Sequence, residues 1–170
     1  TAPMFLYFPA RRLPKIARDF LTYTRGPSAQ VVIRRAGFVD QTPEEMPLAV
    51  QGDRLANAIK VAGDELPLET LQTMLRVLRP MNRLTTLFRF QRGSSRLDAQ
   101  SRSNVQQLAR AIEGGLYDGR KLGFVGFSDG EGPAAGNREI ARKRAEAVRD
   151  AVLAAAETAN PARLNIEIHA

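Results

Sequence analysis

The chain of 170 residues contains no cysteine and only one histidine, His169. The missing cysteines exclude disulfides and thiolate metal sites, and a single imidazole leaves little for a histidine-based metal centre. We therefore expect neither a metal nor another cofactor. No apolar run approaches the ~20 residues that a transmembrane helix needs. Because the first residue is Thr1 rather than methionine, we expect the chain to be part of a longer or processed product.

Acidic residues are outnumbered, which gives a net charge of +7, and 21 of the 25 basic residues are arginine. The excess is spread, with +3 on residues 1–82 and +4 on residues 83–170. A basic surface can serve nucleic acid, anionic envelope polymers or a membrane surface, or can simply face solvent. Aromatic residues are not interleaved with the basic ones as base stacking requires, so we expect no nucleic-acid partner.

The first half of the chain predicts one strand followed by helices. A buried strand is indicated by the apolar run MFLYF, which lies between two prolines. Helical spacing and Pro/Gly boundaries predict four helices. These segments are the strand at 4–8 and the helices at 14–23, 27–37, 55–62 and 66–78. The proline-rich stretch 41–47 is a candidate domain boundary.

The second half predicts alternating strands and helices. Strands are expected at 84–90, 122–127 and 164–168, and helices at 101–116 and 137–156. This βαβαβ order predicts an α+β fold, in which helices pack on a small mixed sheet behind a mainly helical N-terminal segment. The domains expected from this pattern are an N-terminal lobe at 1–47, a helical linker at 48–82 and a C-terminal domain at 83–170.

The loop after the second of these strands contains Gly126-Phe127-Ser128-Asp129-Gly130, which fits the G-x-S-x-G pattern of a serine nucleophile. That pattern needs a helix directly after the serine, but Pro133 and several glycines intervene. An orienting acid for His169 would also have to come from the long helix. A serine hydrolase that depends on Ser128 is therefore a minor alternative, and we expect no enzymatic activity.

A longer spacing is more specific. From Asp129 onwards the sequence reads D-x-x-G-x-x-x-x-N-x-x-I-x-x-x-R-A-x-x-V, and it includes Gly132, Asn137 and Arg144. This pattern resembles the signature of the OmpA C-terminal-like peptidoglycan-binding family. Upstream, Phe90, Ser95 and Leu97 are similar to the segment between that family's first strand and first helix. The resemblance covers residues 84–170.

The resemblance implies a binding site. In that family an aspartate and an arginine hold the diaminopimelate residue of the peptidoglycan stem peptide, and the matching residues here are Asp129 and Arg144. Asp129 would accept hydrogen bonds from the ligand ammonium, and Arg144 would fork onto its carboxylate. Asn137 is expected to cap the following helix and tighten the loop. The alternative is that Asp129 and Arg144 form only an internal salt bridge.

Some positions depart from the family pattern. Phe127 replaces the usual histidine, and Ala141 replaces the usual serine. Secondary contacts are expected from two loops, through Ser128, Gly132, Gln91, Arg92 and Gly93.

Residues 1–40 resemble the C-terminal end of phosphate-type ABC-transporter substrate-binding proteins, through the stretch ARDFLTYTRGPSAQVVIRRAGFV. The alternative is a small helical packing unit. The resemblances together imply non-covalent binding of peptidoglycan by a Gram-negative envelope protein, in the periplasm or associated with the outer membrane. The alternative function is a periplasmic receptor for a phosphate-like anion.

Overall fold

The computed structural model describes residues 4, 6–61, 68–91, 94–128 and 133–170. It divides into two compact units, Thr1–Thr42 and Pro43–Ala170, which are described separately below. Within the described residues, no helix combines the length and the apolar character needed to span a bilayer.

The first unit contains two helices, α1 (Lys15–Thr24) and α2 (Pro27–Arg35), close to their predicted positions. Pro27 begins α2, where its missing N–H costs nothing. Gln30 is 4% exposed and joins the turn before α2 to the segment after it. Its amide donates to the Thr24 carbonyl at 2.9 Å and accepts from the Gln41 N–H at 2.8 Å.

Most large apolar side chains of this unit are exposed. Ile16, Phe20 and Tyr23 share a face of α1, and each is about half exposed or more. The strand predicted at 4–8 is wrong for its described residues, which are exposed and form no strand. An apolar run becomes a strand only when a partner strand pairs with it, and no described segment does so here.

The second unit opens with a short antiparallel ladder between β1 (Glu45–Met46) and β2 (Arg83–Leu84). Between these strands lie a 3-10 turn at Leu48–Gln51, α3 (Gly52–Val61) and α4 (Leu68–Leu78), and both α-helices agree with prediction. Glu45 of β1 accepts two hydrogen bonds from Arg120 and one from Asn82. The pKa of Glu45 falls to about 2, chiefly because of the Arg120 hydrogen bonds.

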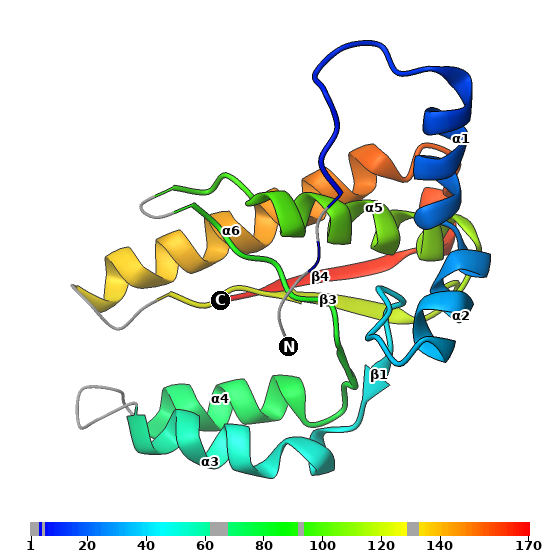
Figure 1. Cartoon of the computed structure of the whole chain (residues 1–170). Coiled ribbons are helices and arrows are strands. Elements are labelled where there is room, and N and C mark those ends of the chain that lie inside the picture. Colours follow the sequence, from blue (N-terminus) through cyan, green and yellow to red (C-terminus); the bar gives the residue numbers. More distant parts are fainter. Residues whose placement is uncertain (1–3, 5, 62–67, 92–93, 129–132) are drawn as a thin grey trace. The chain divides into compact units, whose positions relative to one another are not determined.

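The rest of this unit is a layer of two helices on a parallel pair of strands (Figure 1). Helix α5 packs against α6, and α6 also packs on β3 and β4. The strands are in register from Lys121↔Asn165 to Val125↔His169. The element bounds are α5 (Ala99–Glu113), β3 (Lys121–Val125), α6 (Ala134–Ala155), a 3-10 turn at Pro161–Arg163 and β4 (Asn165–His169).

One core lies between these layers, because apolar residues recur at helical spacing on both helices. The buried stripe of α6 contains three small or β-branched positions, Ala141, Ala145 and Val148, and ends at Val152, which is fully buried. Small residues let α6 approach the strands closely. The core cluster comprises Val105, Leu108, Ala109, Ile112, Tyr117, Leu122, Phe124, Ala145, Val148, Val152 and Ala156.

The predicted α+β class is confirmed, but two further local predictions are wrong, besides the strand at 4–8. The strand expected at 84–90 is reduced to β2 and an isolated bridge between Phe90 and Leu97. Helix α6 begins at Ala134, and its N-cap is Pro133 rather than Asn137. Asn137 instead makes the first backbone bond of the helix, from its N–H to the Pro133 carbonyl at 3.1 Å. Alanine is the strongest helix former, so Ala134 and Ala135 extend the helix toward Pro133.

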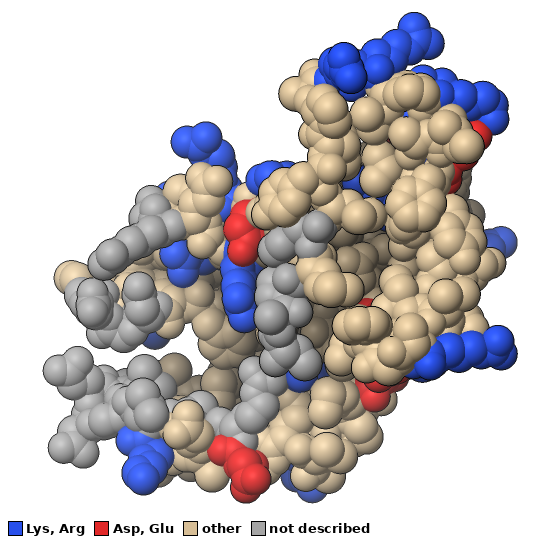
Figure 2. All heavy atoms as spheres, viewed as in Figure 1, with Lys and Arg blue, Asp and Glu red and all other residues tan. Residues whose placement is uncertain are grey.

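The basic residues do not form one dense patch on the face drawn in Figure 2, where Lys and Arg side chains are scattered among uncharged surface. This distribution agrees with a charge excess that is spread along the sequence.

Candidate functional site

Arg144 lies on α6 between the buried positions Ala141 and Val148, so its long side chain starts from the core-facing side of the helix. The guanidinium carbon is 5.4 Å from the centroid of the Phe90 ring, which is within cation–π range. One terminal nitrogen, Nη1, donates to the carbonyl oxygen of Phe127 at 3.5 Å, a long hydrogen bond. The Nε nitrogen is buried and has no hydrogen-bond partner among the described residues. Arg144 therefore makes no ion pair with any residue that the structure describes.

The end of β3 reaches Arg144 because the strand and the helix touch through backbone. Gly126 extends the β3–β4 ladder by donating its N–H to the His169 carbonyl at 2.9 Å. A side-chain carbon at Gly126 would collide with the carbonyl group of Ala141 on α6. Glycine at this position thus allows the contact, which holds the next residue, Phe127, beside the turn of α6 that carries Arg144.

The aromatic side of the site is held by the start of α5. Asp98 caps this helix by accepting the Ser101 N–H at 2.7 Å, and this backbone hydrogen bond is the main cause of its lowered pKa. Ser101 is 1% exposed, and its hydroxyl accepts the Arg89 N–H at 2.6 Å. Phe90 follows Arg89 and bridges to Leu97. A buried hydrogen-bond network therefore fixes the backbone on which the Phe90 ring is mounted.

Some of the predicted site residues lie within the described part of the chain and others do not. Asn137 is partly buried in the first turn of α6, Ser128 is partly buried after β3, and Gln91 is exposed. Asp129, the predicted partner of Arg144, lies outside the described residues, as do Gly132, Arg92 and Gly93. The two departures from the family pattern also differ. The Phe127 side chain is 63% exposed, whereas Ala141 is 4% exposed at the contact with Gly126.

Phe90 is the site residue that sequence reasoning missed. It was recognised only as part of the strand-to-helix segment, and its contact with Arg144 joins positions 54 residues apart. The aromatic residue at the end of an apolar run was the available signal, but its partner could not be read from a local pattern.

A shallow groove of about 450 Å³ lies beside this site along α6, lined by Gln91, Ser95, Arg96, Leu97, Arg102, Ala147 and Ala151.

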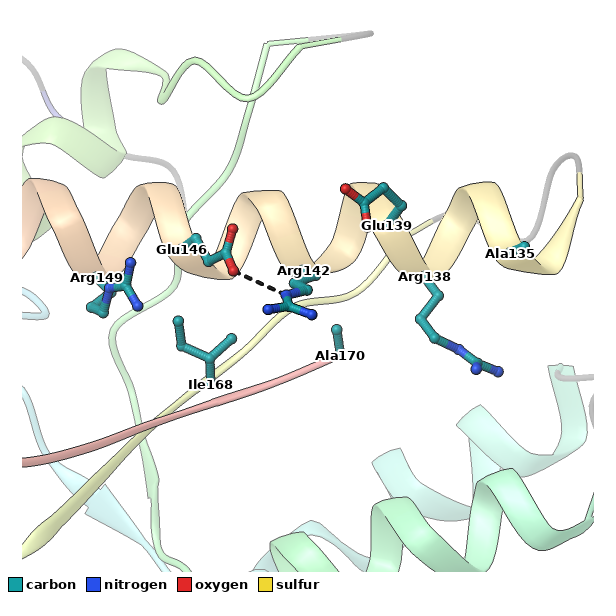
Figure 3. A pocket seen from close by; sticks show the side chains of 8 residues that line it. All are labelled: Ala135, Arg138, Glu139, Arg142, Glu146, Arg149, Ile168 and Ala170. Atoms are coloured by element: carbon teal, nitrogen blue, oxygen red, sulfur yellow. Dashed lines mark hydrogen bonds and ion pairs between the residues drawn. The ribbon is translucent and has the colours of Figure 1, made fainter.

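A second groove, of about 570 Å³, lies along another face of α6 and does not include Arg144 (Figure 3). Its lining is Ala135, Arg138, Glu139, Arg142, Glu146, Arg149, Ile168 and Ala170. Most of its charges are already paired. Arg142 binds Glu146 at 3.0 Å, Glu139 binds Lys143 at 3.4 Å and Arg149 binds Asp150 at 2.7 Å. The pattern is typical of a solvated helix face with i,i+4 ion pairs.

The hydrolase alternative finds no support in the geometry. His169 lies on β4, and its Nε2 is 3.2 Å from a carboxylate oxygen of Glu167 on the same strand. Glu167 also pairs with Lys121 at 2.7 Å, and the hydrogen bond from Lys121 lowers the pKa of its carboxyl. Among the described residues, no hydrogen bond joins Ser128 to His169, and no three His, Cys, Asp or Glu side chains cluster as a metal site would require.

A comparison with family models identifies the family of the C-terminal residues that carry Phe90 and Arg144. Residues 89–170, just under half of the chain, match the model of the OmpA family. A comparison with curated proteins found no match. The family match does not extend to residues 1–40, where the resemblance to substrate-binding proteins stays a prediction. OmpA family domains are generally non-enzymatic and belong to the cell envelope of Gram-negative bacteria. Residues 89–170 of this chain are therefore an OmpA family domain, and that family is known for peptidoglycan binding.

Proposed function

We propose that the domain at 83–170 binds the diaminopimelate residue of the peptidoglycan stem peptide non-covalently. Diaminopimelate carries an ammonium and a carboxylate on one carbon. Arg144 would donate to the carboxylate from its planar fork of N–H groups, and Asp129 would accept from the ammonium. The bound domain would hold an envelope protein on the cell wall, in the periplasm or associated with the outer membrane.

The observation that carries this proposal is the state of Arg144. The residue is partly buried, its Nε is buried with no hydrogen-bond partner among the described residues, and no described carboxylate neutralises its charge. A buried charge is costly unless an opposite charge or hydrogen bonds compensate for it. An anionic ligand at the terminal nitrogens would supply the missing negative charge, and a carboxylate fits a guanidinium in shape and charge.

Helix geometry supports Asn137 as a further contact. Asn137 and Arg144 are seven residues apart on α6, so they lie on the same side of the helix, two turns from each other. Ser128, Gly132, Gln91, Arg92 and Gly93 complete the proposed site as secondary contacts from the two neighbouring loops.

The chain upstream of the domain is proposed to consist of a helical linker at 48–82 and the end of a substrate-binding-protein-like lobe at 1–47.

Non-covalent capture of a polymer can be weak per site, because many neighbouring sites raise the local concentration of ligand. A single anchoring domain is therefore sufficient for the proposed role.

The test is a titration of the chain with a diaminopimelate stem peptide, and with a lysine-type stem peptide that lacks the side-chain carboxylate. We expect binding of the first peptide only. Arg144→Ala should weaken it by about 10- to 100-fold, because a charge-assisted hydrogen bond contributes about 1.5–3 kcal/mol.

The matched control is Arg138→Ala. Arg138 is an exposed arginine on the same helix, in the groove of Figure 3, and its removal changes the net charge equally. Equal affinities of the folded wild-type, Arg144→Ala and Arg138→Ala chains would reject the site. Equal weakening by both variants would show a general charge effect instead.

A further inference from the structure

The guanidinium of Arg144 is held by an aromatic ring rather than by a carboxylate. Its central carbon lies 5.4 Å from the Phe90 centroid, and its Nη1 reaches the Phe127 carbonyl at 3.5 Å. A ring attracts the cation through its π face and forms no hydrogen bond with the in-plane N–H groups. Arg144 is thus oriented, while its charge is not cancelled by any described residue.

The buried Nε restricts how a ligand can reach this arginine. Nε is covered and has no partner in the described part of the chain, so the side of the guanidinium formed by Nε and one terminal nitrogen is closed to a ligand. The terminal nitrogens, Nη1 and Nη2, form the end of the fork. An approaching carboxylate can therefore be bound end-on, by the two terminal nitrogens.

The ring itself is placed by groups that do not belong to the loop after β3. The Arg89 N–H is bonded to the buried Ser101 hydroxyl, and Phe90 bridges to Leu97 at the entry to α5. Phe90 also packs against the hydrophobic core. Its position is consequently set before any ligand binds.

We propose that Phe90 is a positioning residue for ligand recognition, and that its ring holds the Arg144 guanidinium so that Nη1 and Nη2 meet a ligand carboxylate end-on. The inference rests on the proposed function, since it concerns the same site. An unrestrained arginine side chain loses rotamer freedom when it binds a ligand. A ring that orients the guanidinium in the free protein removes part of this cost.

The variants that test the proposal are Phe90→Leu, which removes the ring but keeps an apolar side chain, and Phe90→Tyr, which restores a ring. Each is titrated with the diaminopimelate stem peptide and with the same peptide amidated at the diaminopimelate carboxylate. We expect Phe90→Leu to weaken binding of the carboxylate form by about tenfold, given the strength of cation–π contacts. The amidated form should change much less, and Phe90→Tyr should restore wild-type affinity.

A second readout needs no ligand. In the NMR spectrum of the free chain, the Arg144 Nε–H signal should be shifted by the ring current of Phe90. Phe90→Leu should abolish this shift, Phe90→Tyr should retain it, and Arg144→Lys identifies the signal by deleting it. A positioning role predicts this spectroscopic change even where thermal unfolding of the variant is unaltered.

The outcomes separate the two proposals. If the wild-type chain binds neither peptide, the proposed function fails, and the Arg144 signal still reports whether the ring contact exists. If the wild-type chain binds, the positioning role is overturned by wild-type affinity in Phe90→Leu. It is also overturned by equal weakening for both peptides, or by an unshifted Arg144 signal.

Discussion

The backbone of Gly126 at the end of β3 touches the backbone of Ala141 on α6. The carbonyl group of Ala141 occupies the space that a side-chain carbon on Gly126 would need. Ala141 is itself 4% exposed, so this contact is part of the packed interior. Ala141 lies three residues before Arg144 on α6. Gly126 directly precedes Phe127, whose carbonyl accepts a hydrogen bond from Arg144. The contact thereby couples the packing of the sheet to the geometry of the candidate site.

Gly126→Ala should destabilise the chain, because the added methyl group forces the strand and α6 apart. Overpacking of an interior typically costs about 1–3 kcal/mol. Chemical denaturation followed by circular dichroism measures the change. Gly136→Ala is the control, since Gly136 lies in α6 with nothing near its missing Cβ. Alanine there should leave stability unchanged or raise it, by up to about 1 kcal/mol. A Gly126→Ala chain as stable as the Gly136→Ala chain would contradict the predicted contact.

The helices could be predicted because their signals are local. The buried stripe Ala141, Ala145, Val148 and Val152 follows helical spacing, so α6 could be identified without knowing what it covers. The predicted start of α6 is wrong because Asn137 is a good capping residue and suggests a helix start at that position. The alanines before it are stronger helix formers, and they extend the helix past Asn137 toward its N-terminus. The strand predicted at 84–90 failed for another reason. Its alternation suits a strand, but hydrogen-bonded pairing depends on a neighbour that local patterns do not reveal.

The candidate site was predictable only where its residues are close in sequence. Arg144 was expected because the loop and helix match one continuous motif of the family that the sequence resembles. The Phe90 ring and the Gly126–Ala141 contact arise when segments distant in sequence pack together, and no periodicity encodes such pairs. Asp129 stays a prediction, since it lies outside the described residues.

Asp98→Ala should lower stability through loss of the α5 cap. The Asp98 carboxylate accepts the Ser101 N–H at 2.7 Å, and replacing a capping aspartate by alanine costs about 1 kcal/mol. Asp98→Asn keeps an oxygen acceptor and should retain most of the stability. Thermal unfolding of the two variants measures the difference. The cap assignment would be refuted if the alanine and asparagine variants unfolded at the same temperature.

The ion pair between Glu45 and Arg120 should make stability depend on acidic pH. Arg120 lowers the pKa of Glu45 from 4.5 to about 2, so the unfolded chain takes up this proton at higher pH than the folded chain. The contribution of Glu45 to stability is therefore complete above pH 4.5 and is lost as the pH falls toward 2. Glu45→Gln should be less stable than wild type at neutral pH and should match it near pH 2.

Denaturation curves recorded across this pH range, at low salt, give the comparison. Glu157→Gln is the control, because Glu157 is exposed and forms no ion pair in the described part of the chain. It should show the wild-type pH dependence. A Glu45→Gln chain with an unchanged pH profile would show that the pair contributes nothing to folding.

Tyr117→Phe should not destabilise the chain, although Tyr117 is only 4% exposed and belongs to the core. Its hydroxyl is buried and has no hydrogen-bond partner among the residues that the structure describes, so its removal leaves the ring packed and abolishes an uncompensated desolvation cost. We expect a gain of up to about 1 kcal/mol, whereas Tyr117→Ala should cost several kcal/mol, about as much as other large core truncations.

Burial raises the pKa of the Tyr117 phenol above 10.0, so the unfolded chain releases this proton first. Wild-type stability should therefore fall as the pH rises past about 10, and the phenylalanine variant should lack this part of the loss. A clear loss of stability in Tyr117→Phe at neutral pH would mean that a water molecule satisfies the hydroxyl.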